Sequence, residues 1–414
     1  MPGTWVTSDQ AEMIFTAHRL LAVGRFDFAD PGQKVRELPW LLAEPGKPPK
    51  PRLFPGTPLA LLPLVALDRG LGLAGPPDLG TFVHLEGPAF IALALLAIGL
   101  ALRRRGASDL AVVVSVLMAG SAWPVWQISR RAGAEPLLAL LVGAFFLASA
   151  NRQARLQGLL VFALPWCHPT ASLIAPVLAA GELFARGPGE PRREAWLRAA
   201  RLFALSVAGT LTTALVWNGW YHRRWGGGYA LYGVLGGVLQ LPPLQVASAY
   251  LKESLLHVPL LLMISAAALI AGGRAGAKQF FVPIAMLAAH LLLFSLYSYS
   301  FLIEPARRLA VVWVTFGFAL GGTFDRLRLS ERTAAALVLL SLLSGVYWYR
   351  LVEANYYAWA DGSYEPLVGW ITLAVAGRSA ALWALPVALL SGFAGFAGFR
   401  LSRAFAPATS GTGS

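Results

Sequence analysis

Nine stretches of this sequence are long and apolar enough to cross a lipid bilayer, and they constrain the fold more than any other feature. A bilayer core about 30 Å thick needs roughly 20 apolar residues per helix. Because every backbone polar group in lipid must be satisfied within the protein, we expect an all-α, polytopic integral membrane protein with about 10–12 membrane helices. The stretches are 82–102, 110–127, 134–150, 200–218, 254–272, 279–301, 308–323, 333–352 and 380–400; the shorter runs 229–247 and 366–377 are expected to be re-entrant or interfacial.

The composition supports this class and excludes others. Hydrophobic residues make up 57% of the chain and charged residues 13%, whereas soluble domains average about 25% charged residues. The net charge is +13, but the Arg residues lie in short clusters between apolar runs, so we expect the lipid bilayer as a partner and no nucleic acid. The single cysteine, Cys167, excludes a disulfide framework.

The Lys and Arg clusters also predict the orientation of the helices. If successive loops alternate between the two sides of the membrane, the Lys and Arg residues beyond residue 81 divide into 17 on one side and nine on the other. The positive-inside rule assigns the larger group to the cytoplasm. This alternation requires the stretch 157–184 to cross the membrane and return, and Pro165 and Pro169 break that stretch. We therefore predict two short helices there, residues 1–81 outside the cytoplasm, and a cytoplasmic C-terminus at the plasma (inner) membrane.

The segment ahead of the first apolar run contains two expected helices. Apolar side chains recur in 9–24 at the spacing of one helix face, with Ser8 or Asp9 as N-cap and Gly24 as C-cap. The run LFPGTPLALLPLVAL is apolar, punctuated by proline and too short to span. It is expected to form a helix along the membrane interface.

Ionisable residues near membrane helices are the default functional candidates. Asp9 and Glu135 each begin an expected helix, where interaction with the helix dipole is the ordinary role. His168 lies in the broken stretch, where a polar group ordinarily satisfies freed backbone. Arg307 and Arg308 in FLIEPARRL are either interfacial side chains or an anion clamp, since Arg offers a bidentate fork. Taken singly, none of them specifies a function.

Their order along the chain is more informative. The segments TSDQAEMIFTAHRLLAVGRFDF, FPGTPLALLPLVAL, AEPLLALLVGAFF, GLLVFALPWCHPTASLIAPVLA, VWNGWYHRRWGGGYALYG and EPARRL follow one another in this order. Together they resemble the C-type (GT-C) superfamily of polyprenyl-phosphate-dependent glycosyltransferases, which includes dolichyl-phosphate-mannose mannosyltransferases and aminoarabinose transferases. Each motif alone is weak, and the resemblance covers roughly residues 5–325.

The resemblance implies a division of the chain into four parts. A long first extracytoplasmic loop with interfacial helices is followed by a GT-C-like catalytic region, which contains the broken helix pair at 157–184. The parts are the loop at 1–81, the catalytic region at 82–325, C-terminal membrane helices at 326–403, and a disordered tail at 404–414.

It also implies roles for particular residues. In the family, a first-loop carboxylate activates the acceptor hydroxyl as a base or helps to hold a divalent cation, Mg or Mn, and cationic groups stabilise the departing lipid phosphate. The implied site comprises Asp9 and Glu135 as catalytic carboxylates, with Asp9 also the metal candidate; His168, Arg307 and Arg308 at the donor phosphate; and Glu12, Asn218 and Tyr221 along the acceptor or sugar.

Three departures from the family pattern have consequences of their own. The family's usual Ser-Asp-Glu motif reads Ser8-Asp9-Gln10 here, so the nearest second acidic residue is Glu12. The Thr-Arg-Pro motif is Cys167-His168-Pro169, which replaces a permanent cation by a group that is mostly neutral at pH 7. The family's first membrane helix has no counterpart before Ser8, so the resemblance predicts a hydrophobic segment upstream of Met1.

The resemblance therefore favours an enzyme that transfers a sugar from a polyprenyl-phosphate donor to a lipid, glycan or protein acceptor outside the cytoplasm. A multi-spanning transporter or lipid-handling protein is the alternative, because broken helices also occur at transport sites. Against it, the sequence shows no internal repeat, and its acidic residues cluster in outer loops. A membrane-anchoring scaffold is the third interpretation.

Overall fold

The computed structural model describes residues 8–26, 50–51, 54–73, 81–129, 132–185, 190–221, 258–296, 309–327 and 329–344. Within these ranges the regular structure is helical, with no strand beyond the isolated bridge residue Lys50. The predicted all-α class is confirmed for this part of the chain. The expected elements at 229–247, 366–377 and 380–400, and the expected tail at 404–414, lie outside the described residues.

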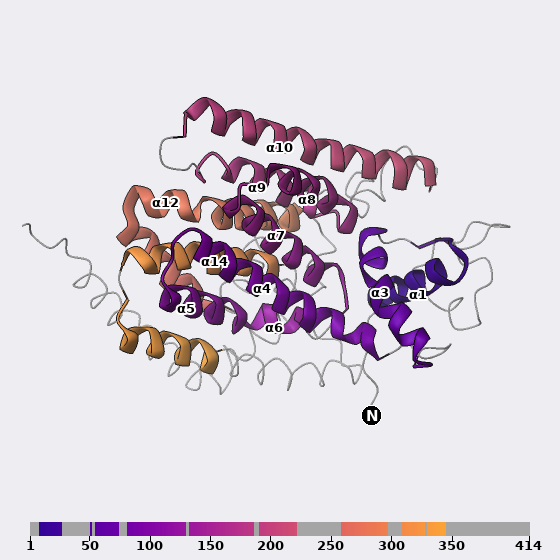
Figure 1. The fold of residues 1–414 in the computed structure, drawn as a ribbon, viewed down its shortest axis with the longest axis horizontal. Helices are drawn as coiled ribbons and strands as arrows, with labels where there is room; N and C mark the ends of the chain where they lie inside the picture. The colour runs from indigo at the N-terminus through magenta and orange to yellow at the C-terminus, as the bar shows by residue number, and fades with distance from the viewer. Residues whose placement is uncertain are drawn as a thin grey trace, which may run out of the picture.

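The described helices form a bundle of roughly parallel and antiparallel rods, with a smaller helical unit at one end (Figure 1). Three helical stretches, Phe82–Arg104, Arg192–Tyr221 and Leu260–Leu292, are long and apolar enough to cross a membrane. The elements are α1 (Ser8–Val23), α3 (Gly56–Gly70), the 3-10 turn η1 (Phe82–Leu85), α4 (Glu86–Arg104), α5 (Asp109–Gly120), α6 (Trp123–Ser129), α7 (Ala134–Ala150), α8 (Ala154–Cys167), α9 (Ala171–Gly181), α10 (Arg192–Thr212), the π-helical η2 (Thr213–Tyr221), α12 (Pro259–Leu296) and α14 (Ala310–Arg326), and a further helix covers 331–344.

Several of these helices match the sequence-based predictions closely. The run 134–150 is α7, and the helix expected at 9–24 is α1, followed by Gly24 at φ +68°. A left-handed residue at that place ends a helix, which glycine does without steric cost. The stretch 157–184 is broken as predicted, because α8 ends at Cys167 and α9 begins at Ala171.

One predicted span differs from the structure. The run 110–127 was expected to be one helix, but it is divided into α5 and α6, because Gly120 is a poor helix former and Pro124 cannot donate a backbone hydrogen bond. The runs 254–272 and 279–301 were expected to be two helices, and in their described parts α12 is indeed two helices, which meet at a kink at Gly273 with φ 51° and ψ −134°.

Small residues allow the helices of the bundle to approach closely. A Cβ atom at Gly143 of α7 would lie 2.7 Å from the carbonyl oxygen of Ala94 in α4, so a larger residue there would separate the two helices. Gly209 of α10 likewise lies against the backbone of Phe162 in α8. Such contacts between small residues are the usual packing mode of helices in membranes. Large buried side chains, among them Phe145 and Trp313, fill the core around them.

Hydrogen bonds and ion pairs tie several helices together at one end of the bundle. The Ser149 hydroxyl at the end of α7 accepts from Arg105 at 3.2 Å and donates to Glu182 at 2.6 Å. Glu182, just after α9, also pairs with Arg198 of α10 at 3.0 Å. We name this the Arg-rich end. Because Glu182 returns to the end of α7, α8 and α9 form the predicted hairpin.

The smaller helical unit occupies the opposite end of the bundle, which we name the α3 end. Here α1 and α3 lie beside the start of α4, at the right of Figure 1. Buried apolar side chains join α1 to α3, to η1 and to the segment just ahead of α7; they are Met13, Ile14, Ala17, Leu61, Val65, Val83 and Ala132. The interfacial helix expected from LFPGTPLALLPLVAL is therefore present as α3, packed on α1.

A buried carboxylate fixes the connection from α3 to α4. Asp68 near the end of α3 is fully buried and accepts hydrogen bonds from the backbone N–H groups of Thr81, Phe82 and Val83 at 2.8, 2.8 and 2.9 Å. These donors belong to the start of η1, where N–H groups have no partner within the helix. Asp68 thus holds the end of α3 against the start of η1.

Replacing Asp68 by Ala should lower the free energy of unfolding by about 2 kcal/mol, because three backbone donors lose a charged acceptor. The measurement is denaturant unfolding of the purified chain in detergent micelles, followed by helical circular dichroism. Asp109→Ala is the matched control, since the Asp109 side chain is 77% exposed and pairs with an exposed Arg103; exposed pairs contribute less than about 1 kcal/mol. Equal losses in the two variants would contradict the role of Asp68.

Candidate functional site

Two carboxylates come together where α4 and α7 begin, at the α3 end. Glu86, the first residue of α4, accepts a hydrogen bond from the backbone N–H of Gly133 at 2.8 Å. Glu135 lies in the first turn of α7, and its Oε2 atom would be 3.2 Å from a Cβ atom at Gly133. Both carboxyl groups lie at the positive end of a helix dipole, an ordinary place for an acidic side chain.

Glu86 differs from an ordinary helix cap in its burial. It has 0% relative exposure, and its Oε1 atom has no hydrogen-bond partner among the described residues. A buried polar atom without a partner is costly, and in native structures it requires an explanation. We therefore include Glu86 in the candidate site.

The break between α8 and α9 is organised by His168. This residue is extended, with φ −160° and ψ 145°, and its Nδ1 atom accepts from the backbone N–H of Thr170 at 3.2 Å. Nδ1 also lies 2.8 Å from the Thr170 hydroxyl. Because Nδ1 accepts a backbone hydrogen bond, a neutral ring carries its proton on Nε2. The expected role of His168 in satisfying freed backbone is confirmed by these bonds.

The first turn of α3 packs directly on this break. A Cβ atom at Gly56 would lie 2.8 Å from both the carbonyl oxygen of Trp166 and the sulfur of Cys167. Only a residue without a side chain fits there without a shift of backbone. The start of α3 is therefore held next to His168, which follows Cys167 in the chain.

An aromatic group connects the N-terminal segment to η2. Trp217 and Tyr221 stack with ring centroids 4.6 Å apart, and Phe26, just after α1, meets the Trp217 ring edge-on at 5.5 Å. The Lys50 ammonium lies 4.5 Å from the centre of the Tyr221 ring and donates to the Tyr221 carbonyl. Both features attach residues ahead of α3 to the π-helical η2, and π-helical turns occur frequently at functional sites.

The structure brings several of the sequence-predicted residues to the α3 end. Glu135, His168 and Tyr221 lie there as described above, and Glu12 is buried in α1 beside the apolar cluster. Asp9 lies in the first turn of α1, but its side chain is outside the described part of the structure. The same holds for the side chain of Asn218 in η2, and for Arg307 and Arg308 altogether.

Sequence reasoning missed Glu86 and Lys50. Glu86 in HLEGPAF begins an apolar run, which is where an ordinary cap would stand, whereas its burial and its bond to Gly133 join residues far apart in the sequence. Lys50 lies in the Pro-rich KPPKPRLFPG, far from Tyr221 in the sequence. Its contact with η2 is long-range, and no local pattern marks it.

The divalent cation that the resemblance implies stays a prediction. A magnesium ion prefers six oxygen ligands, usually including water and one or two carboxylates. Glu86 and Glu135 supply two carboxylates of this kind, and no group of three or more metal-ligating side chains occurs among the described residues. Of the described residues, Glu86 and Glu135 would be the ones to hold such a cation.

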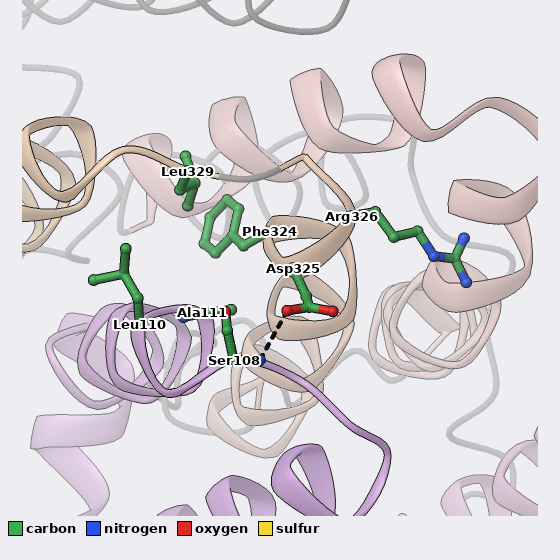
Figure 2. A pocket seen from close by; sticks show the side chains of 7 residues that line it. All are labelled: Ser108, Leu110, Ala111, Phe324, Asp325, Arg326 and Leu329. Carbon is green, nitrogen blue, oxygen red and sulfur yellow. Dashed lines mark hydrogen bonds between the residues drawn. The ribbon is translucent and has the colours of Figure 1, made fainter.

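A pocket of about 540 Å³ lies at the opposite, Arg-rich end. Figure 2 shows Asp325 turned towards Ser108, whose backbone N–H donates to the carboxylate at 2.8 Å, and Arg326 extended away from the other side chains. The remaining lining side chains are mostly apolar. The Asp325 carboxylate, which faces this pocket, already accepts a hydrogen bond from Ser108. The pocket is therefore a weaker candidate for the functional site than the α3 end.

A scan against protein-family models and searches of curated proteins and of solved structures find no match to this chain. The functional interpretation therefore depends on the residues and contacts described above, together with the ordered motifs.

Replacing Gly56 by Leu should separate α3 from α8 and expose Cys167. Overpacked contacts cost about 1–3 kcal/mol, so modification of this buried thiol through local opening should become about tenfold faster or more. The rate is measured with a thiol reagent on the purified chain, in which Cys167 is the one cysteine. Gly70→Leu is the control in the same helix, because a Cβ atom at Gly70 meets nothing within 4 Å. An unchanged rate in Gly56→Leu would show that the contact is not tight.

Proposed function

We propose that this chain is a polytopic membrane glycosyltransferase of the GT-C type, which transfers a sugar from a polyprenyl-phosphate donor to an acceptor at the extracytoplasmic membrane surface. One observation carries the proposal. The motifs that resemble the family are scattered between residues 8 and 221 of the described chain, yet α1, α3, the start of α7, the α8–α9 break and η2 all meet at the α3 end.

The proposed orientation follows from the distribution of charge. The loops after α4, α7 and α9 carry Arg residues and meet at the Arg-rich end, as Arg105 and Arg198 show. Under the positive-inside rule this end faces the cytoplasm. The α3 end then lies at the outer surface, where an amphiphilic donor and an aqueous acceptor can both reach it.

The chemistry of transfer needs a base and a site for the leaving phosphate. A carboxylate takes the proton from the acceptor hydroxyl as the new glycosidic bond forms. Donors with partial or full positive charge stabilise the phosphate that leaves the sugar. Glu135, with Glu86 beside it, is proposed for the carboxylate side, and His168 for the phosphate side. Asp9 and Arg307 or Arg308 remain implied by the resemblance alone.

The exposed face of α10 and η2 fits approach of the lipid from the side. Phe203, Leu211 and Trp220 are exposed there, Trp220 to 74%. In a bilayer this face contacts acyl or prenyl chains without desolvating polar groups. The donor chain would lie along α10 with its phosphate near η2.

The transporter alternative has less support. Transport across the bundle requires polar groups along a path between its ends, and intramembrane charges mark such paths. From α4 to α14, the described Asp, Glu, Lys and Arg residues lie between helices, in the first or last turns of helices, in the first half of α10, or just after the α12 kink at Gly273. The charged side chains are at the ends, which suits a reaction at one surface.

Glu135→Gln should lower the rate of sugar transfer at least about 100-fold, because removal of a general base costs two or more orders of magnitude. The measurement uses the purified chain, and a second chain extended upstream, with a radiolabelled polyprenyl-phosphate sugar. Asp9→Asn is tested in parallel.

Asp109→Asn is the control for loss of a carboxylate, since Asp109 begins α5 at the Arg-rich end. Transfer that is unaffected in Glu135→Gln and Asp9→Asn would contradict the assigned roles. If neither chain consumes any polyprenyl-phosphate sugar, the proposed function is wrong, and transport becomes the hypothesis to test.

A further inference from the structure

The first turn of α3 has backbone donors that nothing in the described structure satisfies. Pro55 stands at the N-cap and provides no side-chain hydrogen bond, and the next two residues, Gly56 and Thr57, have N–H groups with no partner among the described residues. Pro58 has no N–H group. Helix starts ordinarily receive a Ser, Thr, Asp or Asn cap, so this start is open.

A buried hydroxyl lies in the same turn. Thr57 has 1% relative exposure, and its Oγ1 atom has no hydrogen-bond partner in the described part of the chain. Because helical side chains tilt towards the N-terminus, the hydroxyl of the second helical residue leans to the open start of α3. The Trp166 indole N–H, at the end of α8, likewise has no described partner.

The helix dipole of α3 favours an anion at its start, where the carbonyl oxygen of Trp166 is the one acceptor that the described contacts of Gly56 show. The start of a 15-residue helix carries the positive end of its dipole, and α3 has no acidic side chain in its first turn. Gly56 packs on Trp166 and Cys167, so His168 comes next along the facing segment. An imidazole can add a further donor or a positive charge.

We infer that the first turn of α3 binds a phosphate ester through the N–H groups of Gly56 and Thr57 and the Thr57 hydroxyl. A tetrahedral phosphate accepts several hydrogen bonds in different directions, as donors from α3 and from the α8–α9 break provide, and helix starts are ready sites for it. That the ester is the prenyl phosphate of a sugar donor rests on the proposed function; the binding of a phosphate does not.

The test is binding to the full purified chain in detergent, with farnesyl phosphate, inorganic phosphate and the neutral farnesol as probes. Thr57→Val keeps the shape of the side chain and removes the hydroxyl, whereas Thr57→Ser keeps the hydroxyl. Thr315→Val is the matched control, since Thr315 is also fully buried and its hydroxyl bonds to Val312 within α14.

Thr57→Val is expected to weaken farnesyl phosphate binding about tenfold, the loss that accompanies removal of one hydrogen bond to a charged group. Thr57→Ser and Thr315→Val should bind like the original chain, and farnesol should bind equally to all four. Because Oγ1 has no internal partner, Thr57→Val should also keep its melting temperature, so that weaker binding is not a folding defect.

The inference is overturned if Thr57→Val binds farnesyl phosphate as tightly as the original chain, or if the original chain binds neither phosphate probe. Binding of inorganic phosphate that matches farnesyl phosphate, and that Thr57→Val weakens, supports the site but identifies its ligand as free phosphate. Phosphate binding at Thr57 without any sugar transfer would leave this inference standing while the proposed function fails. Normal sugar transfer, together with unchanged farnesyl phosphate binding in Thr57→Val, would leave the proposed function standing while this inference fails.

Discussion

In the described helices from α4 to α14, charged side chains are confined to the terminal turns, the first half of α10 and the residues just after the α12 kink, and the rest of the structure depends on this constraint. Backbone groups there are satisfied within each helix, and neighbouring helices are held by close packing at small residues such as Gly143. Charged groups are left to the two ends of the bundle. Any chemistry that needs a carboxylate or a guanidinium must therefore take place at one end or the other.

The two ends use their polar residues differently. At the Arg-rich end, Ser149, Glu182 and Arg198 bond to one another, which closes the α8–α9 hairpin and leaves their charges paired. At the α3 end, Glu86 and Thr57 each keep a buried atom without a described partner, as Gln157 does in the first turns of α8 near the other end. Open buried atoms are tolerated where a ligand completes them. The site is placed at the α3 end because the open atoms there lie among the segments that carry the ordered motifs.

The local features of the fold could be predicted from the sequence, and the long-range ones could not. Pro165 and Pro169 mark the α8–α9 break, and apolar spacing with Gly24 marks α1, because both signals lie within a few residues. The burial of Glu86 depends on Gly133, and the position of Lys50 depends on Tyr221. These partners are brought together by the packing of whole helices, which hydropathy along one chain does not specify.

The central claim is that the α3 end and the Arg-rich end lie on opposite sides of a membrane. Single cysteines at Arg69 in α3 and Arg104 in α4, both exposed, report on the two ends, and the native Cys167 is buried. The measurement is labelling of R69C and R104C by a membrane-impermeant maleimide in right-side-out vesicles. The account predicts that R69C is labelled directly and R104C only after the vesicles are opened. Labelling of both from one side, or of R104C alone, would contradict it.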